Sequence, residues 1–126
     1  MNDARQGLRA TVVRAGAARI APQDWGCLTW FADAALGNSQ EVTVGRCLLH
    51  PGRANPRHSH PNCSEVLVVI QGRIAHTVED GREVELETGD TISIPPRMAH
   101  QARNIGPGDA VLMLTFTSAQ RQVEGE

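Results

Sequence analysis

Hydrophobic and polar residues alternate in short runs along most of the 126-residue chain. Alternation over about four to eight residues is typical of half-buried β-strands. From residue 42 onward, turns rich in glycine, proline and aspartate separate the runs at fairly even spacing, and no amphipathic helical pattern occurs. The pattern predicts strands at residues 42–50, 64–71, 73–78, 83–88, 91–95, 100–104 and 110–117. Many short strands of this kind predict an all-β sandwich or barrel.

The segments on either side of this central region follow a weaker pattern. Residues 25–31 are predicted to form one more strand, and residues 1–20 alternate loosely, as an arm or an edge strand would. The polar residues at the end of the chain are expected to fray. We therefore divide the chain into an N-terminal arm with edge strands (1–41), a barrel (42–117) and a flexible tail (118–126).

The composition is that of an ordinary globular domain, with 40% hydrophobic residues, 21% charged residues and a formal net charge of −2. No block of like charges is present, which argues against nucleic acid or an anionic membrane surface as a partner. No apolar run approaches the length of a membrane span, and arginines near the start argue against a secretory signal, so we expect a cytoplasmic protein. Lysine is absent, which excludes Schiff-base chemistry on a lysine side chain.

The sequence HSHPNCSE, residues 58–65, carries the most specific chemical signal. His58 and His60 are two residues apart, and on an extended segment such residues point to the same side. Glu65 opens an apolar strand, where a lone carboxylate is costly to bury unless it is paired or bound to a metal. A bare pair of histidines is more often part of a polar loop. His100, after a later turn, could bring a third imidazole to the same point.

Two groups of residues resemble the two motifs of the cupin superfamily, in its small single-domain form. The first group is Gly52, His58, His60, Glu65 and Gly72, and the second is Gly89, Pro95, Arg97, His100 and Asn104. Arg97 departs from the family pattern, which usually has glycine at that position. The resemblance implies a jelly-roll barrel, or double-stranded β-helix, with a divalent transition metal inside, such as Fe, Mn, Ni or Zn. It also implies that the metal ligands are His58, His60, Glu65 and His100.

A metal site of this kind predicts a small metal-dependent enzyme, because open coordination positions can accept a substrate. Our first hypothesis is a dioxygenase-type oxidoreductase acting on a small, oxygen-rich substrate chelated at the metal, since the complete ligand set is the one seen in dioxygenases of the family. Isomerase, decarboxylase and lyase chemistry use the same ligands, and a non-catalytic sensor that binds a small ligand is the rival class. The few aromatic residues indicate a small aliphatic pocket.

Two further residues lie close enough in sequence to serve the site. If the turn at Gln71 and Gly72 were a two-residue hairpin, His76 would share the inward face of Glu65. It would then be a contact behind the ligands or, in the alternative that we favour, a hydrogen-bonded core histidine. Cys63 lies between the ligands, but we expect it to be a free thiol because the other four donors complete the set.

The arginines near the motifs and the aromatic residues of the N-terminal part each have two interpretations. Arg97, like Arg53 and Arg57, could bind a substrate carboxylate or could simply lie on a loop surface. Residues 25–31 hold both tryptophans, which could line a pocket or cover a sheet edge against a second subunit. We favour the second interpretation, because the resemblance implies a homodimer in which N-terminal strands contribute to the partner's sheet.

Overall fold

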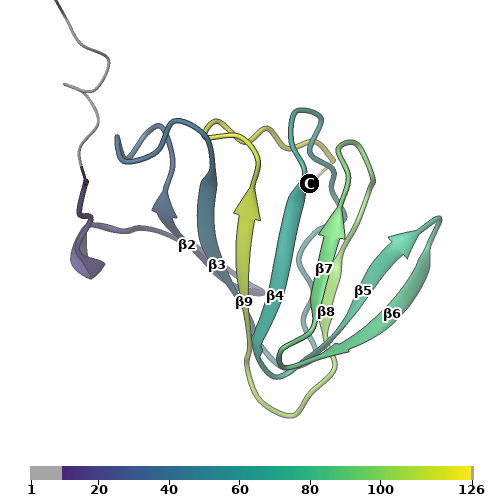
Figure 1. Cartoon of the computed structure of the whole chain (residues 1–126). Helices are drawn as coiled ribbons and strands as arrows, with labels where there is room; N and C mark the ends of the chain where they lie inside the picture. Colours follow the sequence, from purple (N-terminus) through teal and green to yellow (C-terminus); the bar gives the residue numbers. More distant parts are fainter. Residues whose placement is uncertain (1–9, 126) are drawn as a thin grey trace, which may run out of the picture.

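The computed structural model describes residues 10–125, which form antiparallel β-strands arranged in two sheets around a common interior (Figure 1). The strands are β1 (Arg19–Gln23), β2 (Gly26–Ala32), β3 (Thr43–Leu49), β4 (Glu65–Gln71), β5 (Arg73–Glu79), β6 (Arg82–Glu87), β7 (Thr91–Ile94), β8 (Ala102–Asn104) and β9 (Ala110–Phe116). The helical structure in this part of the chain is one 3-10 turn at Ala15–Ala17. No helix among the described residues is long and apolar enough to cross a membrane.

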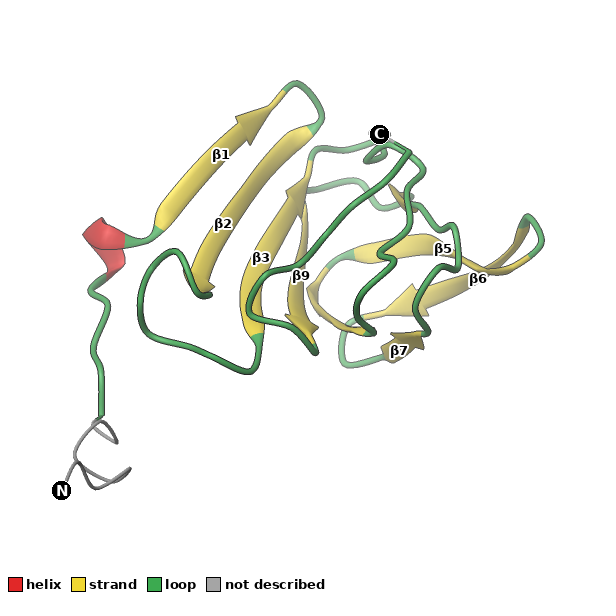
Figure 2. Cartoon of the chain, turned by 90° about the horizontal axis from the view of Figure 1, so that it is seen from above, coloured by secondary structure: helices red, strands yellow, loops and turns green. Residues whose placement is uncertain are grey.

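The two sheets form the walls of a jelly-roll barrel, as the sequence predicts. One sheet has the strand order β1-β2-β3-β9-β4-β7, and the other has the order β6-β5-β8. Seen from above, β5 and β6 stand across the interior from β3 and β9 (Figure 2). Closing two short sheets over one interior hides most of their apolar faces from water, which is the main favourable term in folding.

The alternation of residues along the central strands decides what points into the barrel. In β4, the residues Glu65, Leu67 and Val69 are buried, whereas the residues between them are more exposed. Glu65 therefore belongs to the same inward row as two aliphatic side chains. Its position in the register places a carboxylate inside an apolar barrel.

The connection between β4 and β5 is not the two-residue hairpin supposed in placing His76. β4 pairs with β7 and β9, and β5 pairs with β6 and β8, so the chain passes from one sheet to the other at Gly72. Gly72 has φ +90, and a Cβ atom there would lie 3.1 Å from Ala110 Cα. A glycine in the left-handed region thus makes a corner that a hairpin register cannot describe. The inference that His76 faces inward holds, because it is 1% exposed.

The ends of the chain also depart from the expected arrangement. β1 is the edge strand expected in the N-terminal part, while residues 1–9 of the expected arm lie outside the described residues. The expected flexible tail is instead a segment that returns across the barrel, and we call residues 117–125 the C-terminal strap (Figure 1). Ala34 N donates to Ala119 O at 2.9 Å, and Ser59 and Glu124 exchange backbone hydrogen bonds of 3.0 and 2.9 Å. Such pairing satisfies the polar backbone of the strap, which the sequence pattern does not reveal.

The apolar core lies between the two sheets. Its largest fully buried side chains come from several strands and include Phe116, Leu49, Ile74 and Leu112. Asn104 is buried beside this core and donates to the carbonyl oxygens of Leu49 and Gly108. These bonds explain how a polar side chain is tolerated at that position.

Arg97 occupies a position where the family pattern usually has glycine, and the strain that this causes in the backbone can be measured. Its φ is +70, in the left-handed region that costs a non-glycine residue roughly 1–2 kcal/mol. Replacing it by glycine removes this strain, while the greater freedom of glycine in the unfolded chain offsets part of the gain. Arg97→Gly is therefore expected to have a free energy of unfolding about 0.5–1 kcal/mol above that of Arg97→Ala, which loses the same side chain but keeps Cβ. Urea denaturation of the two variants measures the difference, and equal values would contradict the strain.

Candidate metal centre

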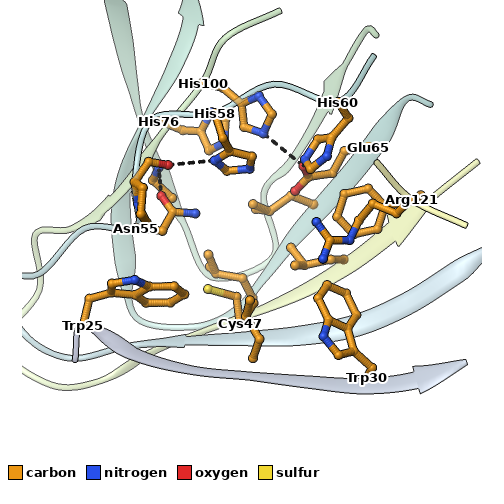
Figure 3. Close-up of a pocket in the computed structure, with 17 residues that line it drawn as sticks. Trp25, Trp30, Cys47, Asn55, His58, His60, Glu65, His76, His100 and Arg121 are labelled. Carbon is orange, nitrogen blue, oxygen red and sulfur yellow. Dashed lines mark hydrogen bonds and ion pairs between the residues drawn. The ribbon is translucent and has the colours of Figure 1, made fainter. Parts of the chain in front are cut away.

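Four potential ligands meet at one end of the barrel interior (Figure 3). His58 and His60 lie on the loop between β3 and β4, and Glu65 is the first residue of β4. His100 lies two residues before the start of β8. One donor atom from each of the four lies within 4.8 Å of those of the others. His60, Glu65 and His100 are buried, and His58 is partly buried. The structure thus brings together all four residues that the resemblance implies.

Backbone hydrogen bonds hold the two motifs in register. His58 N donates to His100 O at 3.0 Å, and His100 N donates to His58 O at 2.7 Å. Arg97 N donates to His60 O at 2.9 Å, so the turn before His100 is also fixed to the first motif. The positions of the imidazoles therefore depend on a small antiparallel bridge between loops far apart in sequence.

Each of the three histidines uses Nδ1 to donate to a carbonyl oxygen. His58 bonds to Pro56 O at 2.7 Å, and His100 bonds to Met98 O at 2.8 Å. His60 bonds instead to Gln122 O of the C-terminal strap, also at 2.8 Å. A carbonyl oxygen only accepts, so Nδ1 carries the proton and Nε2 is left with its lone pair. A carbonyl acceptor at Nδ1 fixes the orientation of the ring and directs Nε2 toward a metal.

The Glu65 carboxylate lies between two of these Nε2 atoms. Its Oε1 is 3.2 Å from His60 Nε2 and 3.1 Å from His100 Nε2. Burial alone would raise the pKa of Glu65, but the adjacent imidazoles of His100 and His60 outweigh it and lower the pKa to about 2. Burial would lower the pKa of His100, whereas the adjacent Glu65 carboxylate raises it above its ordinary value. For His58, burial prevails and lowers the pKa to about 4.

The donor atoms of the cluster require a positive centre between them. Among the described residues, His60 Nε2 is a buried side-chain nitrogen without a hydrogen-bond partner. With its proton on Nδ1, it directs a lone pair toward the Glu65 carboxylate, which is unfavourable unless a cation lies between them. Three imidazoles and one carboxylate suit a divalent ion such as Fe, Mn, Ni or Zn, and a six-coordinate ion would keep open positions. The donor set therefore fits a metal ion.

The cluster forms one wall of a cavity in which about 50 Å³ is accessible to water. That is space for a few water molecules or a small organic molecule. Apolar side chains also line the cavity and include Trp25, Trp30, Leu112 and Phe116. Figure 3 shows the two tryptophans across the cavity from the histidines. The expected aliphatic pocket is thus wrong, because three aromatic rings line this cavity. Both tryptophans face the interior of their own barrel, so the pocket interpretation applies to them rather than the subunit-contact interpretation.

Three polar residues share the cavity with the ligands. His76 stacks on His100, with 5.6 Å between ring centroids and an interplanar angle of 17°. Its Nδ1 donates to Thr77 O at 2.7 Å, and burial lowers its pKa. Asn55 is fixed by Ala102 N, which donates to Asn55 Oδ1 at 2.9 Å. Arg121 enters from the C-terminal strap.

The arginines singled out from the sequence lie elsewhere. The side chain of Arg97 is exposed and is not part of the cavity wall. Arg53 lies 3.7 Å from the exposed carboxylate of Asp24, and Arg57 is exposed at the outer surface. The arginine that lines the cavity is Arg121. The sequence did not predict this role, because the polar strap has no strand pattern that would place its side chains inside or outside the barrel.

The cysteines do not join the cluster. Cys63 is buried outside the cavity wall, and burial raises its pKa, which keeps the thiol protonated. Cys47 does line the cavity, and burial, helped by the charge of Glu65, raises its pKa to about 12. A neutral thiol is a poor metal ligand, so both behave as small apolar side chains here.

Residues 45–116 match the family described as cupin domain. The chain belongs to this family, in agreement with the resemblance of its two motifs. In sequence it is 39% identical over 94 residues to germin-like protein subfamily 3 member 3 of Arabidopsis thaliana, covering 71% of this chain and 44% of that protein. It is 28% identical over 88 residues to oxalate oxidase GF-2.8 of Triticum aestivum, covering 64% of this chain and 39% of that protein.

The fold is also similar to solved structures. The oxalate decarboxylase of Lactobacillus farciminis, in its formate complex, superposes with a TM-score of 0.80 at 19% identity, covering 87% of this chain and 34% of that chain. At this identity the likeness concerns the fold alone. The chain spans less than half the length of the two curated relatives named above.

The bond from His60 to the C-terminal strap predicts that the strap supports metal affinity. Asn62 holds the strap at this point, because its Nδ2 donates to Gln120 O at 3.0 Å and its Oδ1 accepts from Gln122 N at 2.9 Å. Asn62→Ala should release Gln122 O, free the His60 ring and weaken metal binding about tenfold. Titration of Mn(II) or Zn(II) against a competing chelator measures this change.

A matched control is Asn38→Ala, which also removes one amide donor and one amide acceptor. Asn38 Nδ2 donates to Phe31 O at 2.9 Å, and Asp33 N donates to Asn38 Oδ1 at 3.2 Å, away from the cluster. This variant should keep wild-type metal affinity. Equal loss of affinity in both variants would indicate general destabilisation and contradict the role of the strap.

Proposed function

We propose that the protein is a metal-dependent oxidoreductase that acts on a small, oxygen-rich organic acid. The observation that carries this proposal is the buried cluster of His58, His60, Glu65 and His100, which opens onto a small cavity with apolar walls. A site that excludes bulk water and leaves metal positions open favours chelation of a small ligand through its oxygen atoms. The rest of the cavity limits such a ligand to a few non-hydrogen atoms.

The roles of the side chains follow from their contacts. The four clustered residues would hold the metal, which would supply Lewis-acid and redox chemistry when bound. The carbonyl oxygens of Pro56, Met98 and Gln122 fix the rings by accepting their Nδ1 protons. Trp25, Trp30 and Phe116 keep water away from the reacting end of the cavity.

The comparisons support an oxidoreductase over the other reaction classes. An oxalate oxidase is among the relatives identified by sequence, whereas the oxalate decarboxylase is similar in fold alone. We therefore keep the dioxygenase-type hypothesis within a broader class of oxygen-dependent oxidations. An isomerase, decarboxylase or lyase, or a non-catalytic ligand-binding protein, would be recognised as outcomes of the test below.

The test is oxygen consumption by protein loaded separately with Fe(II) and Mn(II). The substrates are oxalate, glycolate, a catechol, a 1,3-diketone and a small thiol, and His60→Ala treated with the same metals is the control. We expect wild-type protein to consume oxygen with a small oxygen-rich acid and His60→Ala to lose at least about 99% of that rate. Product formation without oxygen uptake would point to non-redox chemistry. Tight ligand binding without any product would favour the binding protein.

We also propose that the protein forms a homodimer through its N-terminal strands. β1 is the outer strand of the larger sheet, and its Ile20 is 62% exposed. An unpaired strand edge with an exposed apolar side chain favours pairing with a second strand. Sedimentation velocity should give about twice the 13.6 kDa of one chain. A single species at the mass of one chain over micromolar concentrations would rule the dimer out.

A further inference from the structure

Arg121 is the single cationic side chain, apart from histidines, among the residues that line the cavity. It lies beyond residue 116, where the match to the cupin domain ends, so the family pattern assigns it no role. Figure 3 shows its guanidinium group reaching into the cavity over the ring of Trp30. The guanidinium carbon is 4.4 Å from the centroid of Trp30 and 5.3 Å from that of Phe116. Both rings are buried, so the cation rests on a rigid apolar support.

The backbone around Arg121 is held on both sides. Asn62 bonds to Gln120 O and to Gln122 N, the residues immediately before and after it. Thr43 Oγ1 donates to Ser118 O at 2.7 Å, which ties down the start of the strap. Asn62 belongs to the loop that carries His60 and Glu65, so the guanidinium and the ligand cluster are positioned by one structural unit. An arginine placed in this way is pre-organised for binding and loses little freedom when a ligand arrives.

The charges around the cavity indicate what kind of ligand it would take. The lining residues include one carboxylate, Glu65, and one guanidinium, Arg121. A divalent ion held at the cluster would add positive charge to this wall of the cavity, which favours a small organic anion as the ligand. A carboxylate also matches the planar fork of a guanidinium, with which it can form two parallel hydrogen bonds.

We propose that Arg121 is a specificity-determining residue that binds a carboxylate of the ligand while the other end of the ligand chelates the metal. This inference rests on the proposed function and deepens it, because it restricts the substrate class to small anions with a carboxylate. Neutral diols and amides of the same size lack the carboxylate that matches the fork of the Arg121 guanidinium. The strap thus adds substrate selection to a metal site that the barrel itself supplies.

The experiment measures binding of oxalate and of oxamide, its uncharged diamide, to the full chain with and without Mn(II). Trp25 and Trp30, the two tryptophans of the chain, both line the cavity, so quenching of tryptophan fluorescence reports occupancy directly. Wild-type protein is compared with Arg121→Gln and Arg121→Lys, and circular dichroism checks that each variant is folded. Manganese content is measured in parallel by elemental analysis, so that loss of metal is distinguished from loss of anion binding.

The matched control is Arg46→Gln. Arg46 also lies over an aromatic ring, 5.4 Å from the centroid of Phe31, but it is exposed and outside the cavity. We expect Arg121→Gln to bind oxalate about ten- to a hundredfold more weakly than wild type at unchanged manganese content. Arg121→Lys should recover part of the loss because it keeps the charge but not the fork. Arg46→Gln should bind oxalate like wild type, and oxamide should bind weakly to all four proteins.

The outcomes separate this inference from the proposed function. If wild-type protein holds no stoichiometric manganese, the proposed function fails. The metal-free protein then still tests Arg121, because wild type should bind oxalate more tightly than Arg121→Gln in that form too. Equal oxalate binding by wild type and Arg121→Gln in both forms would overturn the role of Arg121. Absence of oxalate binding by wild type in both forms, or preference of wild type for oxamide, would overturn it as well.

Discussion

The structure depends on one costly element, the carboxylate of Glu65 inside an apolar barrel. Glu65 is 4% exposed and shares its inward row with aliphatic side chains of β4. A buried carboxylate is tolerated only when positive charge or hydrogen-bond donors surround it. Here the surrounding groups are imidazoles whose other nitrogens are fixed to carbonyl oxygens, and a divalent cation would complete the arrangement. The loops on this end of the barrel are organised around that requirement.

The parts that meet this requirement come from three separate regions of the chain. Two histidines are oriented by carbonyl groups of their own loops, whereas His60 relies on Gln122 of the C-terminal strap. The same strap carries Arg121 into the wall of the cavity. The metal ligands and the selection of the ligand are therefore coupled through one segment, which lies outside the residues that define the family match. This arrangement shows how a common barrel can acquire its own specificity at its edge.

The sequence predicted the strands and the ligand cluster because both have local signatures. Alternation of apolar residues locates β4 and β9. The spacing of His58, His60 and Glu65 is specific for the first motif, and the second motif identifies His100, which lies far away in sequence. The crossing of the chain at Gly72, the aromatic lining of the cavity and the course of the strap did not follow from the sequence. Each of these depends on contacts between residues distant in sequence, such as Asn62 with Gln120 and His60 with Gln122. A polar segment without periodicity looks like a frayed tail until its backbone partners are known.

The account rests on the cluster being a metal site, and the metal content of the protein tests this most directly. Wild-type protein and His60→Ala would be purified without added metal and analysed by inductively coupled plasma mass spectrometry. We expect about one transition-metal ion per chain in wild type and a small fraction of that in His60→Ala, with both proteins folded, because the apolar core does not include the cluster. A full complement of metal in His60→Ala, or a metal-free wild type that takes up no ion on reconstitution, would contradict the account.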